Sequence, residues 1–378
     1  MENLILHVMG VYQGKSGYSL HTIQFQQALA GKVTTLATDR LLWTPQDRQI
    51  VLDQLWNYHR QGANVVNIAV SPMTFAIALP PYPGWKVSFS VWESTKLESE
   101  WLQAAPLAHR YWTATQWNRQ VYVDNGLPAD KIDVVPEGVD PALFNPHGPR
   151  FPQLDADPRF KFLSVGKFED RKNSAAMIRA FDEEFHQQED VMLLLLADNQ
   201  FVADFDLNKE LERLNLKNPR NIGAGRWVPT ADTLAAIYRS CNAFLAPTRA
   251  EGWGLPIGEA MACGLPTIVT HYSGPSEFTN GDNALLLDYK LIPIPRDGFV
   301  KANDPGVWAE PDMDQFRRLM RWVYNHRQQA AAIGQRAALE MTRDWTWEKA
   351  ADKALALIRH HFPKQLAQQP LDTYWRLP

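Results

Sequence analysis

The stretch Glu251-Gly252-Trp253-Gly254-Leu255-Pro256-Ile257-Gly258-Glu259-Ala260-Met261-Ala262 follows an apolar run at 243–246. Its glycines permit close approach of the backbone to a ligand. A helix that begins near Pro256 or Ile257 directs free N–H groups toward whatever lies in front of it. Glu251 and Glu259 are then far enough apart to hold different parts of an elongated ligand, and carboxylates accept hydrogen bonds from hydroxyls. The stretch predicts a strand, a ligand-binding loop and a helix.

Short apolar runs alternate with helical stretches on both sides of this segment. The runs in the first half are 4–9, 65–70 and 86–92, with helices at 19–30 and 97–108, and the runs 121–123 and 132–135 close it. The second half has strands at 160–165, 191–197, 220–222, 243–246 and 267–269, with helices at 174–185, 230–239 and 257–262. From residue 312 the pattern is almost wholly helical. This alternation predicts parallel sheets with crossover helices.

The length predicts two domains, because 378 residues exceed what one core usually supports. The proline-rich segment 145–158 is the best linker. We therefore expect an N-terminal domain at 1–150 and a second domain at 151–345. Residues 346–378 would be a final helix and tail that cross back to the first domain. Open parallel sheets bind ligands beyond the carboxyl ends of their strands, so the cleft between the domains is the expected site.

Basic residues mark a second motif, at 164–173. Gly166 and Lys167 lie in the loop that follows the predicted strand 160–165, and Lys172 comes at the start of the next helix. Two cations beside a helix N-terminus can neutralise a pyrophosphate and stabilise a departing nucleoside diphosphate. Such an arrangement can replace a metal ion.

The first half adds two weaker signals. A glycine-rich loop with Gly14, Ser16 and Gly17 follows the first strand and offers backbone donors to a phosphate or an acceptor. Glu93 follows the strand at 86–92, where a carboxylate orients an acceptor hydroxyl or takes its proton, and a plain surface glutamate is the alternative. Trp92 and Trp253 are expected in the cleft, because aromatic faces stack on sugar rings.

The 251–262 stretch resembles the Glu-x7-Glu signature of the retaining GT-B glycosyltransferases, particularly family 4. The resemblance implies an α/β fold of two Rossmann-like, doubly wound parallel-sheet domains that face each other across a cleft. The first domain would bind the acceptor and the second the donor. Glu251 would contact the hydroxyls of the sugar, and Glu259 would hold the ribose of the donor nucleotide. The backbone of Gly252, Trp253, Gly254 and Leu255 would lie along the sugar and its phosphate.

Two positions depart from the family pattern. The family usually has Gly-Arg followed five residues later by a lysine, so Lys167 departs from it while Lys172 agrees. Many members have a histidine near the position of Glu93, whose role is therefore open. The implied reaction is transfer of a hexose-type sugar from a UDP- or GDP-linked donor to an acceptor hydroxyl with retained configuration. It needs no metal and no cofactor, since the nucleotide sugar is a substrate.

Composition limits the partners and the compartment. The formal charge is −4 and no segment collects many basic residues, which argues against nucleic acid. Two cysteines and the lack of a basic leader before the first apolar run predict a cytoplasmic protein. The acceptor would be a carbohydrate or a glycoconjugate. Peripheral association with the inner face of the membrane is left open, and so is the oligomeric state.

Other reaction classes have less support. Asp-x-Asp pairs occur at 155/157, 204/206 and 312/314, about as often as chance gives, and none follows a predicted strand. No His and Cys cluster has zinc spacing. A phosphorylase or an epimerase on the same scaffold remains an alternative, as does an inactive module that binds a sugar nucleotide.

Overall fold

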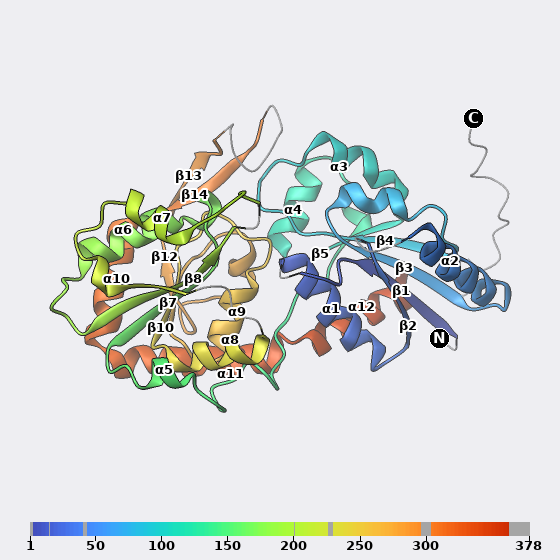
Figure 1. Cartoon of the computed structure of the whole chain (residues 1–378). Helices are drawn as coiled ribbons and strands as arrows, with labels where there is room; N and C mark the ends of the chain where they lie inside the picture. Colours follow the sequence, from blue (N-terminus) through green and yellow to red (C-terminus); the bar gives the residue numbers. More distant parts are fainter. Residues whose placement is uncertain are drawn as a thin grey trace.

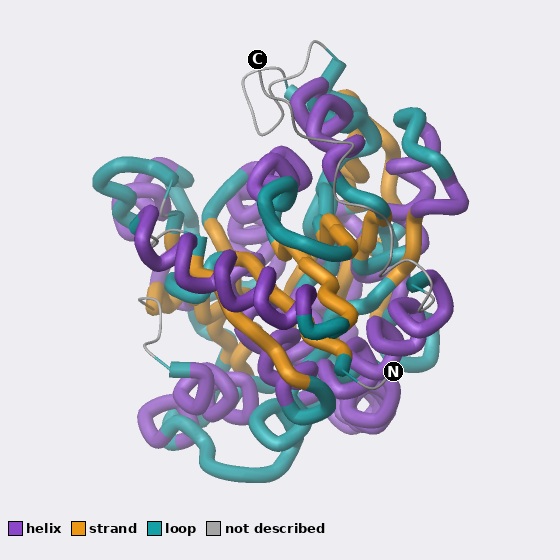
Figure 2. The backbone as a smooth tube through the Cα atoms, turned by 90° about the vertical axis from the view of Figure 1, so that its right-hand side faces the viewer, coloured by secondary structure: helices purple, strands orange, loops and turns teal. Residues whose placement is uncertain are grey.

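The computed structural model describes residues 3–14, 16–40, 44–199, 201–225, 230–295 and 304–362. Two six-stranded parallel sheets form two lobes that lie side by side (Figure 1). Figure 2 shows the strands running through the interior, with helices on the outside. This is the two-sheet α/β arrangement that the alternating pattern predicts.

The first sheet has the strand order β2-β1-β3-β4-β5-β6, and every neighbouring pair is parallel. Its strands are β1 (Leu4–Gly10), β2 (Thr34–Asp39), β3 (Asn64–Val70), β4 (Trp85–Phe89), β5 (Arg110–Thr113) and β6 (Ile132–Val134). All seven residues of β1 are buried, as expected for a strand covered by helices on both faces. The order changes direction at β1 and β3, which places the loop after β1 at a topological switch point.

The second sheet has the order β12-β11-β10-β7-β8-β9 and is also parallel throughout. Its strands are β7 (Phe160–Lys167), β8 (Val191–Asp198), β9 (Ile222–Gly225), β10 (Ala243–Ala246), β11 (Thr267–Thr270) and β12 (Leu285–Leu287). The order changes direction between β7 and β10. The loops that follow these two strands contain the two motifs singled out in the sequence.

Helices cover the faces of both sheets. Those of the first half are α1 (Gly17–Ala30), α2 (Pro45–Arg60), α3 (Ser99–Ala104) and α4 (Gln116–Asp124). Those of the second half are α5 (Pro152–Asp155), α6 (Ser174–Glu184), α7 (Leu207–Arg213), α8 (Ala231–Ser240), α9 (Leu255–Ala262), α10 (Met313–Asn325), α11 (Arg327–Asp344) and α12 (Trp347–His361). Short 3-10 turns are at Met73–Ala78, Ala105–Leu107, Ala129–Lys131, Asp170–Lys172, Pro219–Asn221 and Gly274–Glu277. A separate antiparallel hairpin is formed by β13 (Tyr289–Pro293) and β14 (Val307–Pro311).

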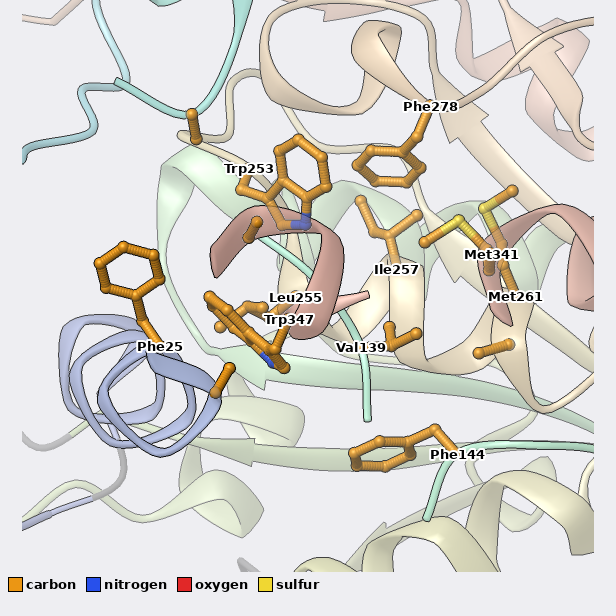
Figure 3. Packing of buried hydrophobic residues seen from close by; sticks show 14 of the residues in the cluster. Phe25, Val139, Phe144, Trp253, Leu255, Ile257, Met261, Phe278, Met341 and Trp347 are labelled. Carbon is orange, nitrogen blue, oxygen red and sulfur yellow. The ribbon is translucent and has the colours of Figure 1, made fainter. Parts of the chain in front are cut away.

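One hydrophobic cluster runs from one lobe into the other. It joins Phe25 of α1 and Trp347 of α12 to Leu255 and Met261 of α9 (Figure 3). Val139, in the segment between the sheets, packs in the same cluster. Continuous apolar contact of this kind holds α9, and with it the 251–262 motif, in a fixed position relative to the first lobe.

The last described helix returns to the first lobe. Figure 1 shows α12 beside α1, and Lys32 forms ion pairs of 2.9 and 2.8 Å with Glu348 and Asp352. His361 Nε2 and Asp133 Oδ1 are 3.0 Å apart at the other end of α12. The predicted tail at 363–378 lies outside the described residues. The domain boundaries at 150 and 345 stay a prediction.

The structure differs from the sequence prediction at several elements. The run 121–123 lies in α4, because Thr115 caps that helix by accepting a hydrogen bond from Asn118 N, and Val121 and Tyr122 are its buried face. The strand predicted at 220–222 begins at Ile222, because residues Pro219–Asn221 form a 3-10 turn. Strands β2 and β5, helix α2 and the β13–β14 hairpin were not predicted from the sequence.

Candidate functional site

A cavity opens where β7, β8 and β10 end and where α6 and α9 begin. The residues that line it are Ser164, Val165, Gly166, Lys167, Phe168, Lys172, Ser174, Met177, Ile178, Leu195, Ala197, Phe244, Leu245, Ala246, Thr248, Glu251, Pro256 and Ile257. It lies at the switch point between β7 and β10, where open parallel sheets bind ligands. The structure thus brings together Gly166, Lys167, Lys172 and Glu251, which the sequence places in two distant motifs.

Glu251 and Lys172 form a close, mostly buried ion pair. Lys172 Nζ lies 2.6 and 2.9 Å from the two carboxylate oxygens of Glu251. Burial alone would raise the pKa of the Glu251 carboxyl, but the charges of Lys172 and Arg171 outweigh burial and hold that pKa below its usual value. Glu251 is therefore an ionised acceptor at neutral pH, suited to hydroxyl groups.

Arg171 is a member of this cluster that the sequence analysis did not single out. Its side chain is 4% exposed, and it donates from Nη1 to Glu251 Oε2 at 3.1 Å and from Nη2 to Glu169 Oε1 at 2.7 Å. Burial would lower the pKa of the Arg171 guanidinium, but the carboxylates of Glu93, Glu251 and Glu169 raise it. The signal that could have found it is its position between Asp170 and Lys172 in the basic motif.

Lys167 lies at the end of β7, on the same side of the cavity. Its Nζ is 3.4 Å from Glu169 Oε2 and 4.9 Å from the ring centroid of Phe201. Gly166 has φ +153°, and a Cβ atom there would lie 3.6 Å from Lys172 Cε. The left-handed backbone at Gly166 brings Lys167 and Lys172 to one end of the cavity without a side chain between them.

Glu93 reaches the same cluster from the first lobe. Glu93 Oε1 is 3.8 Å from Arg171 Nη2, and its side chain is partly exposed. Burial raises the pKa of the Glu93 carboxyl, and Arg171 acts in the opposite direction. Glu93 therefore contacts the Arg171 cluster across the two lobes, and this contact does not assign Glu93 a chemical role.

Glu259 lines a different cavity, of about 360 Å³, which lies between the two lobes. The residues around it are Gly14, Leu20, Gln24, Gly138, Val139, Asp140, Phe144, Thr230, Ala231, Leu234, Leu255, Glu259 and Trp347. Tyr238 donates its hydroxyl hydrogen to Glu259 Oε2 at 3.0 Å. Burial raises the pKa of the Glu259 carboxyl to about 8, although the Tyr238 hydrogen bond lowers it. The helix start of α9 thus separates Glu251 from Glu259, one in each cavity.

The raised pKa of Glu259 makes stability depend on pH. Between its ordinary pKa of 4.5 and about 8, the folded protein keeps a proton there that the unfolded chain releases, so the free energy of unfolding falls as pH rises. Glu259→Gln has no such proton to lose. We expect its Tm to exceed the wild-type Tm near pH 8, with a smaller difference near pH 5, as measured by thermal unfolding. Glu212→Gln, at an exposed position of α7, is the control; an equal Tm difference at both pH values would contradict the prediction.

The expectation that Trp92 and Trp253 lie with their rings in the cleft is wrong. Trp92 is 7% exposed; its ring packs on Trp101 and its Nε1 donates to Lys96 O at 2.6 Å. Trp253 is 2% exposed and packs against Phe278 and Trp345, as Figure 3 shows for Phe278. Burying the apolar surface of these two indole rings in the core stabilises the fold by more free energy than stacking on a ligand in the cleft would contribute.

The glycines beside Trp253 have separate steric roles. A Cβ atom on Gly252 would lie 2.7 Å from Val91 Cβ, so this glycine lets the loop after β4 approach the motif. Gly254 has φ +105° and is the N-cap of α9, which begins at Leu255. A residue with a side chain would be strained at Gly254 and would move the helix start.

The glycine loop of the first lobe begins α1. Ser16 is the N-cap of α1, and its Oγ accepts a hydrogen bond from Ser19 N at 3.1 Å. Gly14, with φ +95°, lines the cavity with Glu259, and Gly17 is the exposed first residue of the helix. Gly14 thus lines the cavity of Glu259, and no described residue of this loop lines the Lys167 cavity.

Two negative findings concern the described part of the chain. No group of three or more His, Cys, Asp or Glu side chains there is arranged to hold a metal ion. Across the same ranges, every helix is too short or too polar to cross a membrane.

Residues 159–292 match the model of the family described as Glycosyl transferases group 1. A D-inositol 3-phosphate glycosyltransferase from Paenarthrobacter aurescens is 25% identical over 240 residues, which are 62% of this chain and 53% of the relative. The chain thus spans about half the length of this curated relative.

Solved structures match over nearly the whole chain. HepE from Anabaena, in complex with UDP-glucose, has a TM-score of 0.70 and 16% identity, and the match covers 93% of this chain and 99% of HepE. A sucrose-phosphate synthase from Thermosynechococcus elongatus has a TM-score of 0.69 and 15% identity, with 94% and 98% covered. The GT-B fold and the resemblance to glycosyltransferases are confirmed, and the transferase activity of the whole chain is taken up as a proposal below. The narrower assignment to family 4 stays a prediction.

Proposed function

We propose that the chain, whose residues 159–292 match the family described as Glycosyl transferases group 1, transfers a hexose-type sugar from a nucleoside-diphosphate donor to an acceptor hydroxyl. The anomeric configuration is retained, and no metal takes part. The observation that supports the proposal is the convergence of Lys167, Lys172 and Glu251 on one cavity at the switch point of the second sheet. Their side chains supply positive charge and a hydroxyl acceptor within one site.

The charges suit departure of a nucleoside diphosphate. The acceptor oxygen bonds to the anomeric carbon as the bond from that carbon to the diphosphate breaks, and the acceptor proton passes to the departing phosphate oxygen. Negative charge develops on the diphosphate, so lysine ammonium groups held in place beforehand stabilise the transition state more than the ground state. Glu251 accepts hydrogen bonds from sugar hydroxyls and so orients the ring.

The lobes would divide the substrate between them. In our proposal the donor phosphates lie by Lys167 and Lys172, and the nucleoside extends past the start of α9 toward Glu259, whose cavity lies between the lobes. The acceptor, a carbohydrate or a glycoconjugate, approaches from the first lobe, on the side of Glu93. A peripheral membrane acceptor and a cytoplasmic location are part of the proposal.

A nucleotide panel tests the donor site. We expect one of UDP, GDP, ADP and CDP to raise Tm clearly above the rest, because a ligand at about 100 times its Kd adds about 2.7 kcal/mol to the folded state. UDP is the first to test, since the HepE structure holds UDP-glucose. A uniform lack of stabilisation by all four nucleotides would contradict the donor site.

Turnover separates the proposal from its alternatives. The matching sugar nucleotide should be consumed in EDTA with a panel of sugar acceptors, and the product should keep the anomeric configuration by NMR. Binding without turnover on every acceptor would instead support the inactive module. Turnover with phosphate as sole acceptor would support a phosphorylase.

A further inference from the structure

The β13–β14 hairpin follows the second sheet in sequence, and buried residues in it and beside it also contact the first lobe. Ile294, Trp308 and Ala309 belong to the same buried cluster as Trp92 and Trp101. Trp308 is 2% exposed. Trp308 and Ala309 of β14 are therefore buried in a cluster made mostly of first-lobe residues, although β14 follows the second sheet in sequence.

Three hydrogen bonds join this hairpin to the loop that contains Glu93, residues 93–96. Trp308 Nε1 donates to Glu93 O at 2.7 Å, Ser94 Oγ donates to Pro305 O at 2.5 Å, and Val307 N donates to Thr95 Oγ1 at 3.0 Å. The three bonds involve the consecutive residues Glu93, Ser94 and Thr95, so they hold the loop along its length.

A glycine makes this approach sterically feasible. Gly306 has φ +84°, and a Cβ atom there would lie 2.6 Å from both Ser94 Oγ and Thr95 Oγ1. Any other residue would be strained in this backbone conformation and would push the 93–96 loop away. Gly306 thus sets how closely β14 and the loop can lie.

The other side of β14 is tied to the catalytic motifs of the second lobe. Ala309 N donates to Arg249 O at 3.0 Å, and Arg249 Nε donates to Glu310 Oε2 at 2.6 Å. Arg249 N in turn donates to Arg171 O at 2.8 Å. One strand therefore contacts the loop of Glu93 on one side and the segment leading to Glu251 on the other.

From this arrangement we infer that β14 is a clasp that fixes Glu93 against the Arg171–Glu251 cluster, with Trp308 as its positioning residue. The inference rests on the proposed function. The Glu93–Arg171 contact is long, at 3.8 Å, and Glu93 is partly exposed, so this contact alone fixes the position of the Glu93 side chain only weakly. The buried indole and its hydrogen bond to Glu93 O supply the missing constraint. The clasp acts on the chemical step, since the donor phosphates would contact Lys167 and Lys172 instead.

Trp308→Phe tests the clasp, because it keeps an aromatic ring in the core and removes the N–H group. We expect kcat to fall about tenfold, the upper range for one hydrogen bond, while the donor KM and the Tm shift produced by the donor nucleotide stay unchanged. In the Glu93→Gln background the same change should cost much less, because both substitutions disturb one arrangement. Trp322→Phe, on α10 of the second lobe, is the matched control and should leave kcat unchanged.

Additive losses in the double variant, or an unchanged kcat in Trp308→Phe, would overturn the clasp. If Trp308→Phe does not fold, Ser94→Ala removes the neighbouring hydrogen bond to Pro305 O and should show the same split between kcat and KM. Absence of wild-type turnover and nucleotide binding would instead refute the proposed function. Wild-type activity is therefore measured first, so that the two failures are distinguished.

Discussion

Replacing Lys172 with alanine is expected to reduce kcat by about a hundredfold or more, the loss that follows removal of one strong transition-state interaction. The Lys172 ammonium lies against Glu251 and lines the cavity at the β7–β10 switch point. In the proposed reaction it faces the phosphate on which negative charge develops. Steady-state kinetics with the donor identified by the nucleotide panel measure the effect.

Three comparisons sharpen this test. Lys209→Ala, at an exposed position of α7, should leave kcat unchanged. Lys172→Arg keeps the charge but not the compact ammonium, and we expect an intermediate loss. Glu251→Ala disturbs the same ion pair, so the double variant should be little slower than the slower single variant. A near-normal kcat in Lys172→Ala would remove this residue from the site.

The sequence predicts the fold best where local and global signals agree. Gly254 and Pro256 predict the start of α9, because a glycine tolerates the backbone conformation before a helix and a proline fits its first turn. The helix begins at Leu255. The alternating apolar runs predict two parallel sheets because buried parallel strands are apolar on both faces. The β13–β14 hairpin lacks such a signal: β13 is largely exposed, and Ile294 and Trp308 are buried by contacts with the distant first lobe.

The candidate site is predictable for motif residues and much less so for their surroundings. Lys172 and Glu251 are visible as charged residues in glycine loops, whereas Arg171 is recognisable only when three carboxylates surround it. The direction in which a side chain points cannot be predicted from the local sequence either. Trp253 lies within the ligand motif, yet its indole packs on Phe278, because adjacent residues in a loop point to different sides.

The same limit explains the two cavities. Glu251 and Glu259 belong to one short motif, and the structure places them on opposite sides of the helix start, in cavities with different walls. The motif gives the spacing of the carboxylates. The packing of the lobes determines which other segments complete each cavity. The Glu259 cavity, for example, is lined by Gly14 and Trp347, which come from opposite ends of the chain.

Arg171 should be the most important single residue for the stability of the site. Its guanidinium is buried and contacts Glu251 and Glu169, with Glu93 at 3.8 Å. Arg171→Met removes a buried positive charge that neutralises Glu251 together with Lys172 and that faces the partly exposed Glu169 and Glu93. We expect the free energy of unfolding near pH 7.5 to fall by about 3–5 kcal/mol, as when one partner of a buried ion pair is removed. Urea unfolding followed by circular dichroism measures it.

The pH dependence of that loss tests its electrostatic origin. In the wild type the pKa of Glu251 is lowered, so its stabilising contribution is present above the ordinary value of 4.5 and is lost only as pH falls through the folded-state pKa. In Arg171→Met the pKa of the Glu93 carboxyl, which burial raises and Arg171 lowers in the wild type, should rise further, so the folded variant binds a proton that the unfolded chain has released and loses stability as pH rises. The difference from wild type should therefore be larger near pH 7.5 than near pH 5. Arg213→Met, an exposed arginine, should show neither effect, and a pH-independent loss in Arg171→Met would mean that packing rather than charge makes Arg171 necessary.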